Sequence, residues 1–281
     1  MARLDASNSR VNVYAADGSY ETMWRLTTRM FGTQNALTSD TAGNTWMMLW
    51  LDAADRPPYS QARARFDASG AVLDTVFIPE PPGRDSGLVA RSEGSQVRYA
   101  LPYGRNSVSA VSGRGGILWA LNTPYVVYSQ HGTRVLRIEK EWQPIAIPEP
   151  ERASARRNTE ASLKAFLPTY SWNGPDIPTE MPPIRSIYAG TDARIWVEIA
   201  APFERYVEPP SPRDSAGAPT EAYRAREKLW DVFSRDGAYL GRVRAPRTVR
   251  LFATRGNYVW GNIRDDDDVP TLVKYRVTPP W

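Results

Sequence analysis

Apolar and polar positions along the chain form short stretches that fit β-strands better than long helices. Four segments share one pattern: an apolar strand ends in tyrosine or phenylalanine, a turn closes on glycine, and a second strand leaves. Glycine supplies the positive φ that a tight hairpin turn needs. We therefore predict hairpins at 10–26, 62–79, 124–140 and 229–246.

The only histidine, His131, precedes the glycine of the third hairpin. Its counterparts are Asp17, Ser69 and Asp236, and such residues tolerate the left-handed region. The alignment predicts that His131 is a turn residue and not a catalytic group. The chain has no cysteine, which excludes disulfides, thiolate nucleophiles and cysteine metal sites.

A second type of hairpin stands before the hairpins at 62–79, 124–140 and 229–246, and once more after the last of them. A large aromatic residue follows the turn of each of these second hairpins. Together the two hairpins make a unit of four antiparallel strands, a to d. Units of about 40–50 residues that repeat in this way are typical of a β-propeller. The aromatic residues could stack on ligands, but they are predicted to fill the space between successive blades; they are Trp46, Trp119, Trp196, Tyr258 and Trp260.

Both ends of the repeat pattern are incomplete. The first unit, from Arg3 to Leu26, supplies strands b to d, and the last, from Thr248 to Val277, supplies a to c. Either an upstream portion carries about one further blade, or the ring closes imperfectly and leaves an exposed strand edge. Complete blades are predicted at 33–79, 106–148 and 184–246, with one further hairpin or partial blade at 86–103.

The loops predict which end of the propeller carries function. The a–b and c–d turns are all short, whereas the b–c and d–a connections include the insertion 149–183 and the long loop 201–227. The insertion begins with proline and glutamate, continues with good helix formers and meets Pro168, which predicts a helix. Its apolar stripe would cap the propeller, and function is expected at this elaborated end; the stripe is Ala155, Leu163, Phe166 and Leu167.

Aromatic and arginine residues gather in the long loop, and these types are enriched in binding hot spots. The proline, serine, glycine and alanine content of the loop also fits disorder. Asn122 and Asp52 lie in analogous b–c loops. The candidate ligand-binding residues are Phe203, Arg205, Tyr206, Tyr223, Asn122 and Asp52.

Four consecutive carboxylates, Asp265, Asp266, Asp267 and Asp268, form the strongest charge feature of the same end. Carboxylates bind Ca²⁺, a hard cation that takes six to eight oxygen ligands. The run lacks the glycine and carbonyl spacing of a dedicated calcium loop, so a solvated turn also explains it. A calcium site therefore stays a candidate, and no other cofactor is expected.

The net charge of +4 includes no basic run of five or six residues, so nucleic-acid binding is not expected. No apolar stretch approaches the roughly 20 residues of a membrane span, and the start "MARLDASNSR" has no signal-peptide core.

Two sets of residues carry a family resemblance. The stretch "LDASNSRVNVYAADGSY" resembles an NHL-type repeat, and "LPYGRNSVSAVSGRGGILWAL" and "REKLWDVFSRDGAYLGRVRAP" resemble poorly characterised bacterial six-bladed β-propellers. The resemblance implies an all-β fold: one propeller domain over 1–281, with four-stranded antiparallel blades, a ring that is complete or open, and one helical cap insertion. It also implies an origin outside the cytoplasm, in the periplasm or secreted; the alternative, since the chain shows no signal peptide, is the cytoplasm.

No nucleophile elbow, HExxH zinc motif, P-loop or dinucleotide fingerprint occurs in the chain. We therefore expect a non-enzymatic propeller that binds a protein, peptide or small molecule at the elaborated end. The alternative is a calcium-dependent hydrolase or lactonase, because propeller lactonases hold a central calcium with Glu, Asn and Asp. The oligomeric state is left open.

Overall fold

The protein is mainly β with one helix. The computed structural model describes residues 2–5, 10–15, 17–26, 37–51, 60–79, 87–92, 95–112, 115–208, 220–264 and 269–278. Three antiparallel sheets in this part have four strands each. The second blade consists of β4 (Thr38–Ser39), β5 (Thr45–Leu51), β6 (Ser60–Phe66) and β7 (Val72–Phe77). The third consists of β10 (Ser107–Val111), β11 (Ile117–Leu121), β12 (Val126–His131) and β13 (Arg134–Glu139). The fourth consists of β14 (Ile184–Ala189), β15 (Ile195–Ile199), β18 (Glu227–Phe233) and β19 (Tyr239–Pro246).

The sheets at the two ends have three strands each within the described residues. The first blade consists of β1 (Ala2–Asp5), β2 (Arg10–Tyr14) and β3 (Tyr20–Arg25). The fifth consists of β20 (Arg250–Arg255), β21 (Tyr258–Arg264) and β22 (Pro270–Arg276). The predicted three-stranded units at both ends are thereby confirmed.

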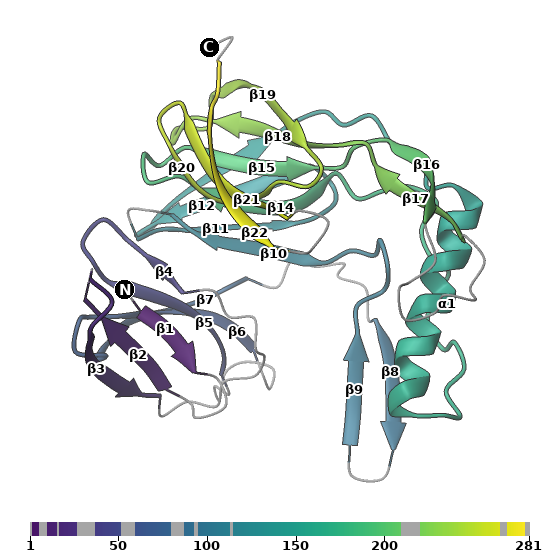
Figure 1. The fold of residues 1–281 in the computed structure, drawn as a ribbon, viewed down its shortest axis with the longest axis horizontal. Coiled ribbons are helices and arrows are strands. Elements are labelled where there is room, and N and C mark those ends of the chain that lie inside the picture. Colours follow the sequence, from purple (N-terminus) through teal and green to yellow (C-terminus); the bar gives the residue numbers. More distant parts are fainter. Residues whose placement is uncertain are drawn as a thin grey trace.

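The blades follow one another in chain order with their faces packed together, which is the arrangement of a β-propeller (Figure 1). The predicted fold class, an all-β propeller with four-stranded antiparallel blades, is confirmed. Each main apolar core lies between two successive blades. Between the first and second blades, Val11 and Trp24 pack against Met47, Leu49 and Phe66.

Trp46, Trp119 and Trp196 lie in these interfaces, as predicted, whereas Tyr258 is 40% exposed and the prediction was wrong for it. Trp46 and Trp119 share the core between the second and third blades, and Trp46 is 1% exposed. Trp196 lies in the core between the fourth and fifth blades, together with Trp230. None of the three stands free to stack on a ligand, because all are buried.

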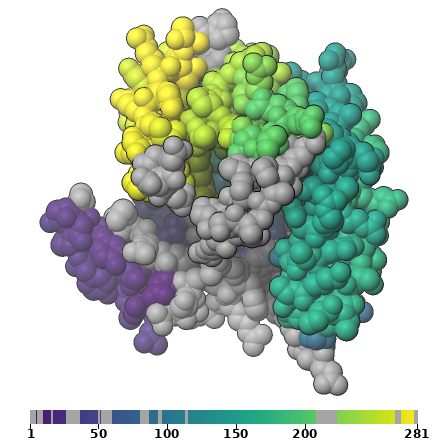
Figure 2. Space-filling model, turned by 45° about the vertical axis from the view of Figure 1, so that its right-hand side comes forward, coloured from purple at the N-terminus to yellow at the C-terminus, as the bar shows by residue number. Residues whose placement is uncertain are grey.

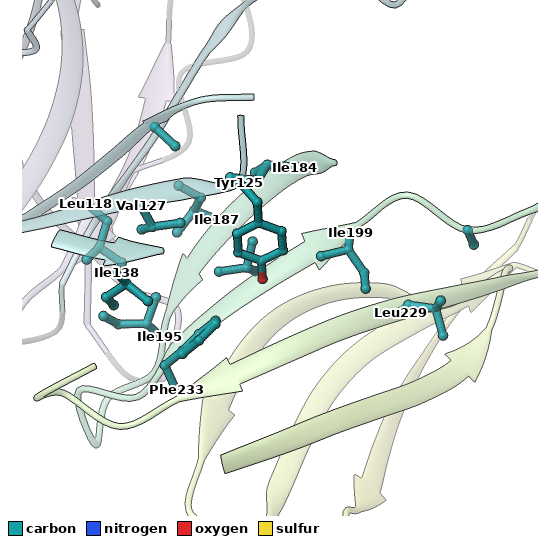
Figure 3. Close-up of a cluster of buried hydrophobic side chains, with 13 residues drawn as sticks. Leu118, Tyr125, Val127, Ile138, Ile184, Ile187, Ile195, Ile199, Leu229 and Phe233 are labelled. Atoms are coloured by element: carbon teal, nitrogen blue, oxygen red, sulfur yellow. The ribbon is translucent and has the colours of Figure 1, made fainter. Parts of the chain in front are cut away.

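The core between the third and fourth blades is built from branched aliphatic side chains with Tyr125 and Phe233 (Figure 3). Alternate residues of β11, β15 and β18 point toward one another across this interface, as expected for strands with a period of two. The removal of these apolar side chains from water makes the interface a main source of the protein's stability. Its aliphatic members include Leu118, Val127, Ile138, Ile187 and Ile195.

The glycines of the four predicted hairpin turns all have positive φ: Gly18 +88°, Gly70 +85°, Gly132 +58° and Gly237 +88°. The residues before them do not, since among the described non-glycine residues only Tyr103 and Ala193 have positive φ. The expectation that the preceding residues, His131 included, occupy the left-handed region was therefore wrong. Glycine alone takes the strained conformation, because it has no Cβ.

The insertion starts with α1 (Glu149–Phe166), which begins after Pro148 and ends before Pro168, as predicted. Leu163 is fully buried, whereas Phe166 is 38% exposed, so the predicted apolar stripe was wrong at Phe166. Leu163 packs on Leu88 and Ala90, which lie in a two-stranded sheet of β8 (Leu88–Ser92) and β9 (Ser95–Tyr99). This hairpin lies beside α1 and belongs to no blade (Figure 1).

Candidate functional site

The connections between strands make the two ends of the propeller different. The a–b and c–d turns are short, and we call the end that carries them the plain end. The insertion with α1 and the hairpin of β16 (Phe203–Glu208) and β17 (Thr220–Ala225) lie at the elaborated end, on the same side of the molecule (Figure 1).

The described residues of the long loop 201–227 include two strands, so disorder, one of the two sequence interpretations, does not apply to them. Its flanking parts pair as β16 and β17, with Arg205 opposite Tyr223. On the same hairpin the Arg224 guanidinium lies 3.4 Å from the centre of the Tyr206 ring. The arginine and aromatic residues therefore support one another on a two-stranded arm, and a cation over an aromatic ring contributes about 0.5–1 kcal/mol when exposed.

Phe203 and Asn122, two other predicted ligand-binding residues, also have structural contacts. Phe203 packs edge-to-face on Tyr103, with ring centres 6.3 Å apart. The Asn122 side chain is buried; its Oδ1 accepts the backbone N–H of Asn106 at 3.0 Å, and its Nδ2 donates to the carbonyl of Gly104 at 2.9 Å. Asn122 thus holds the start of β10 in place.

The remaining candidates, Asp52 and Asp265 to Asp268, lie outside the described residues. Among the residues that are described, no three histidine, aspartate or glutamate side chains gather where they could hold a metal ion. The calcium site therefore stays a prediction from the sequence.

A cavity of about 490 Å³ lies at the elaborated end, between the starts of β10 and β14 and one side of α1. The helix contributes Asn158 and Thr159, and the blades contribute Asn106, Asn122 and Arg185. The lining combines neutral amide and hydroxyl groups with a single charged side chain. A cavity of this size holds a small molecule or a few residues of a peptide.

A second cavity, of about 600 Å³, adjoins the first, and Tyr103 and Pro182 line both. Its other lining residues include Arg105, Lys140 and Trp142. The Tyr103 hydroxyl donates to Glu151 Oε1 of α1 at 2.5 Å. Burial, and then the nearby Glu151 carboxylate, raise the pKa of Tyr103, so its hydroxyl stays protonated at neutral pH.

Sequence reasoning missed Tyr103 as the residue that divides the two cavities. Its one local signal is the "LPYGRN" stretch, in which Tyr103 adopts a φ of +58° between proline and glycine. Non-glycine residues rarely take this conformation, and such strain clusters at functional sites.

A buried ionic network joins the third and fourth blades. Asp231 is 0% exposed and accepts hydrogen bonds from Lys140 Nζ and Arg242 Nε, both at 2.8 Å. The hydroxyls of Tyr125 and Tyr239 also donate to it, at 3.0 and 3.2 Å. Burial alone would raise the pKa of Asp231, but the hydrogen bonds from Arg242 and Lys140 outweigh burial and lower it. Because both carboxylate oxygens of Asp231 accept hydrogen bonds, this side chain cross-links the third and fourth blades.

His131 ends β12, where it pairs with Arg134 across the c–d turn. It lines a cavity of about 230 Å³ at the plain end, together with Ser129, Arg235 and the apolar side chains of Leu136 and Ile195. The side chain of His131 is exposed. Its place at the plain end agrees with the prediction, although the cavity there was not foreseen.

Comparison with known proteins finds no family for the sequence and only distant likenesses among the solved structures. No protein family matches the sequence, and no curated protein matches it. Among solved structures, a member of the DUF4221 family from Bacteroides vulgatus is 10% identical, with a TM-score of 0.47 over 98% of this chain and 75% of that one. A protein of unknown function from Bacteroides caccae is 9% identical, with a TM-score of 0.38 over 96% and 72% of the chains.

A catalytically inactive virginiamycin B lyase from Staphylococcus aureus, crystallised with quinupristin, is 11% identical, with a TM-score of 0.34 over 96% of this chain and 78% of that one. Identities this low concern the fold alone, because one fold hosts many activities. Within the described residues, no helix combines the length and hydrophobicity that a membrane span requires.

Proposed function

We propose that this protein is a non-enzymatic binding propeller whose ligand occupies the two adjoining cavities at the elaborated end. The supporting observation is the pair of cavities, about 490 and 600 Å³, that meet at Tyr103. Both are walled by the insertion 149–183 as well as by blade residues, so a segment that interrupts the repeat helps to build the site.

The chemistry of the first cavity's lining favours binding over catalysis. Asn106, Asn158 and Thr159 offer neutral donors and acceptors, which suit the amide groups of a peptide or the hydroxyls of a small polar molecule. Arg185 adds one positive charge, which suits a carboxylate on the same ligand. Burial and Glu151 keep Tyr103 protonated, and its one O–H is donated to Glu151, so its hydroxyl is not a general base and offers a ligand only an acceptor.

A cavity-filling substitution tests the proposal. Asn158 lies on the exposed surface of α1 and lines the first cavity, so Asn158→Trp should fill that cavity without disturbing a core. Arg157, the preceding helix residue, is also exposed and does not line the cavity, which makes Arg157→Trp a matched control. Binding is measured as a ligand-induced rise in melting temperature with sugars, amino acids and short peptides.

A ligand that raises the melting temperature of the wild type and of Arg157→Trp, but not of Asn158→Trp, supports the proposal. If every ligand that binds the wild type binds Asn158→Trp equally well, the binding site lies elsewhere and the proposal fails.

A further inference from the structure

The cavity at the plain end lies far from the two cavities beside α1 and has a chemistry of its own. Its volume is about 230 Å³, and it is enclosed by the turns that follow β12, β14 and β18, so it lies between the third and fourth blades. The plain-end turns of the fourth blade lie on the side of the molecule away from α1 (Figure 1), whereas the insertion with α1, in teal, makes up the right-hand side in Figure 2. Sites for drug-sized ligands measure about 300–1,000 Å³, so this cavity fits a smaller molecule.

The turn that follows β12 departs from the pattern of the other c–d turns. In the second and fourth blades the residue after the aromatic, Asp67 or Ser234, accepts the backbone N–H groups two and four positions ahead of it and so closes the turn. In the third blade Ser129 has this place, but β12 continues through it to His131, which pairs with Arg134. Ser129, His131 and Arg134 line the cavity instead of closing a turn.

Two backbone positions shape the wall of the cavity. Ala193, in the turn after β14, has a φ of +65°, which residues with a Cβ rarely adopt and which is frequent at binding sites. A Cβ on Gly116 would lie 3.2 Å from His131 Nδ1 and 2.5 Å from the carbonyl oxygen of Gln130. Because residue 116 is glycine, the imidazole of His131 lies close against the start of β11.

The floor of the cavity is apolar. It is formed by Leu118, Leu136 and Ile195, which are part of the core between the third and fourth blades or pack against it. Leu136 is only half-buried, so the cavity leaves a part of this core uncovered. An apolar group of a ligand would gain free energy by covering it.

The rim of the cavity carries more positive than negative charge. The Arg134 guanidinium makes no hydrogen bond or ion pair within the part of the chain that the structure describes. Arg235 lies 3.5 Å from Asp236, the one acidic lining residue, but both side chains are mostly exposed and such a pair is weak. Gly113 and Arg114, which follow the lining residue Ser112 and lie outside the described residues, add no carboxylate. A guanidinium without a partner suits a carboxylate, which it binds through two parallel hydrogen bonds.

We propose that the plain-end cavity binds a small organic carboxylate, with its acid group between Arg134 and Arg235 and a branched apolar body on the floor. The apolar contact provides most of the affinity, and the arginines fix the orientation and reject neutral molecules. The site and the cavities beside α1 share no lining residue, so this proposal does not depend on the proposed function.

The test uses the single histidine of the chain as a reporter. Isotope-labelled histidine gives one imidazole signal in the nuclear magnetic resonance spectrum of the full chain, and this signal comes from the wall of the cavity. The probe is 4-methylpentanoate, which joins a carboxylate to a branched apolar body. Its neutral amide tests the need for charge, and sulfate tests the need for the apolar body. The pH is the same in every titration, so that a shift of the signal reports binding.

The variant Arg134→Gln removes the unpartnered charge from an exposed position, so the fold should stay intact. Arg137→Gln is the matched control, because Arg137 is an exposed residue of the same strand that does not line the cavity. We expect 4-methylpentanoate to shift the imidazole signal with a Kd of about 1 mM or lower. Arg134→Gln should weaken binding by about tenfold, since hydrogen bonds between charged groups are the strong ones. Arg137→Gln and the cavity-filling variant Asn158→Trp should bind as the wild type does.

The proposal is overturned if 4-methylpentanoate at about 10 mM leaves the imidazole signal in place, or if the amide binds equally well. Equal binding of sulfate would show that the floor contributes nothing, which excludes an apolar ligand. Unchanged affinity in Arg134→Gln, or an equal loss in Arg137→Gln, would show that Arg134 does not hold the acid group. A loss in Asn158→Trp would place the ligand beside α1 and not at the plain end.

Discussion

The buried carboxylate of Asp231 allows a quantitative prediction. Replacing it with asparagine keeps the shape but removes the negative charge that Lys140 and Arg242 share. Breaking a buried ion pair costs about 3–5 kcal/mol when the remaining charge is fully buried. Here the side chains of Lys140 and Arg242 are 26% and 36% exposed, so water partly compensates them. We expect a loss of about 3 kcal/mol.

A chain of this length loses roughly 0.6 kcal/mol of stability per degree near its midpoint. The Asp231→Asn substitution should therefore lower the melting temperature by about 5 °C, measured by circular dichroism and supported by urea unfolding. The control is Asp236→Asn, which removes an exposed carboxylate 3.5 Å from Arg235 and should cost under about 1 kcal/mol.

The pH dependence provides a second check on the same residue. The pKa of Asp231 is lower in the folded protein than its ordinary value of 3.8. A lowered pKa contributes stability that is present above the unfolded pKa and is lost as the pH falls through the folded one. The difference between wild type and Asp231→Asn should therefore be full at pH 6 to 7 and shrink below about pH 4. A loss under about 1 kcal/mol at neutral pH, or a difference that grows in acid, would refute the reasoning.

Three further predictions concern stability and metal binding. Gly70 and Gly18 both have positive φ, but a Cβ on Gly70 would lie 2.4 Å from the Trp24 ring, while one on Gly18 would meet nothing within 4 Å. Measured by urea unfolding, Gly70→Ala should therefore cost about 2–4 kcal/mol of stability and Gly18→Ala about 1 kcal/mol. Equal costs would contradict this geometry. Leu163→Ala should lower the stability by about 2–4 kcal/mol and expose α1 to limited proteolysis. Phe166→Ala should lower the stability less, because Leu163 is buried and Phe166 is not. The reverse order would show that α1 packs by another face. Since the proposed binding function needs no metal, calcium should leave the melting temperature unchanged, whereas a rise would favour the calcium-dependent alternative based on Asp265 to Asp268.

Local features of the structure could be predicted because their causes are local. The hairpin turns follow from glycine at fixed positions, and the helix bounds follow from Pro148 and Pro168. The interface tryptophans follow from their recurrence after each a–b turn. By contrast, Asp231 meets Lys140 across 91 positions, and Tyr103 meets Glu151 across 48. No local pattern encodes such partners.

The long loop was misjudged for a related reason. Its middle, rich in proline, serine, glycine and alanine, dominated the composition, whereas the pairing of Arg205 with Tyr223 depends on the register of two strands that flank it. Composition is an average over the whole segment, whereas the pairing register depends on which individual residues lie opposite one another. Tyr103 lies where distant segments meet, which explains why its place between the two cavities was not predicted.

The aromatic side chains between blades have a consequence for how this repeat could be rearranged. Trp46 faces forward along the chain and Trp119 faces backward, so one junction receives an indole from each side. The next junction is filled by branched aliphatic groups with Tyr125 and Phe233, and the one after it takes both of its indoles from the same blade. Neighbouring modules are therefore not interchangeable, and exchanging two of them would bring two bulky rings together at one seam and leave a void at another. The sequential order of the modules is specified by the shapes of the surfaces that join them.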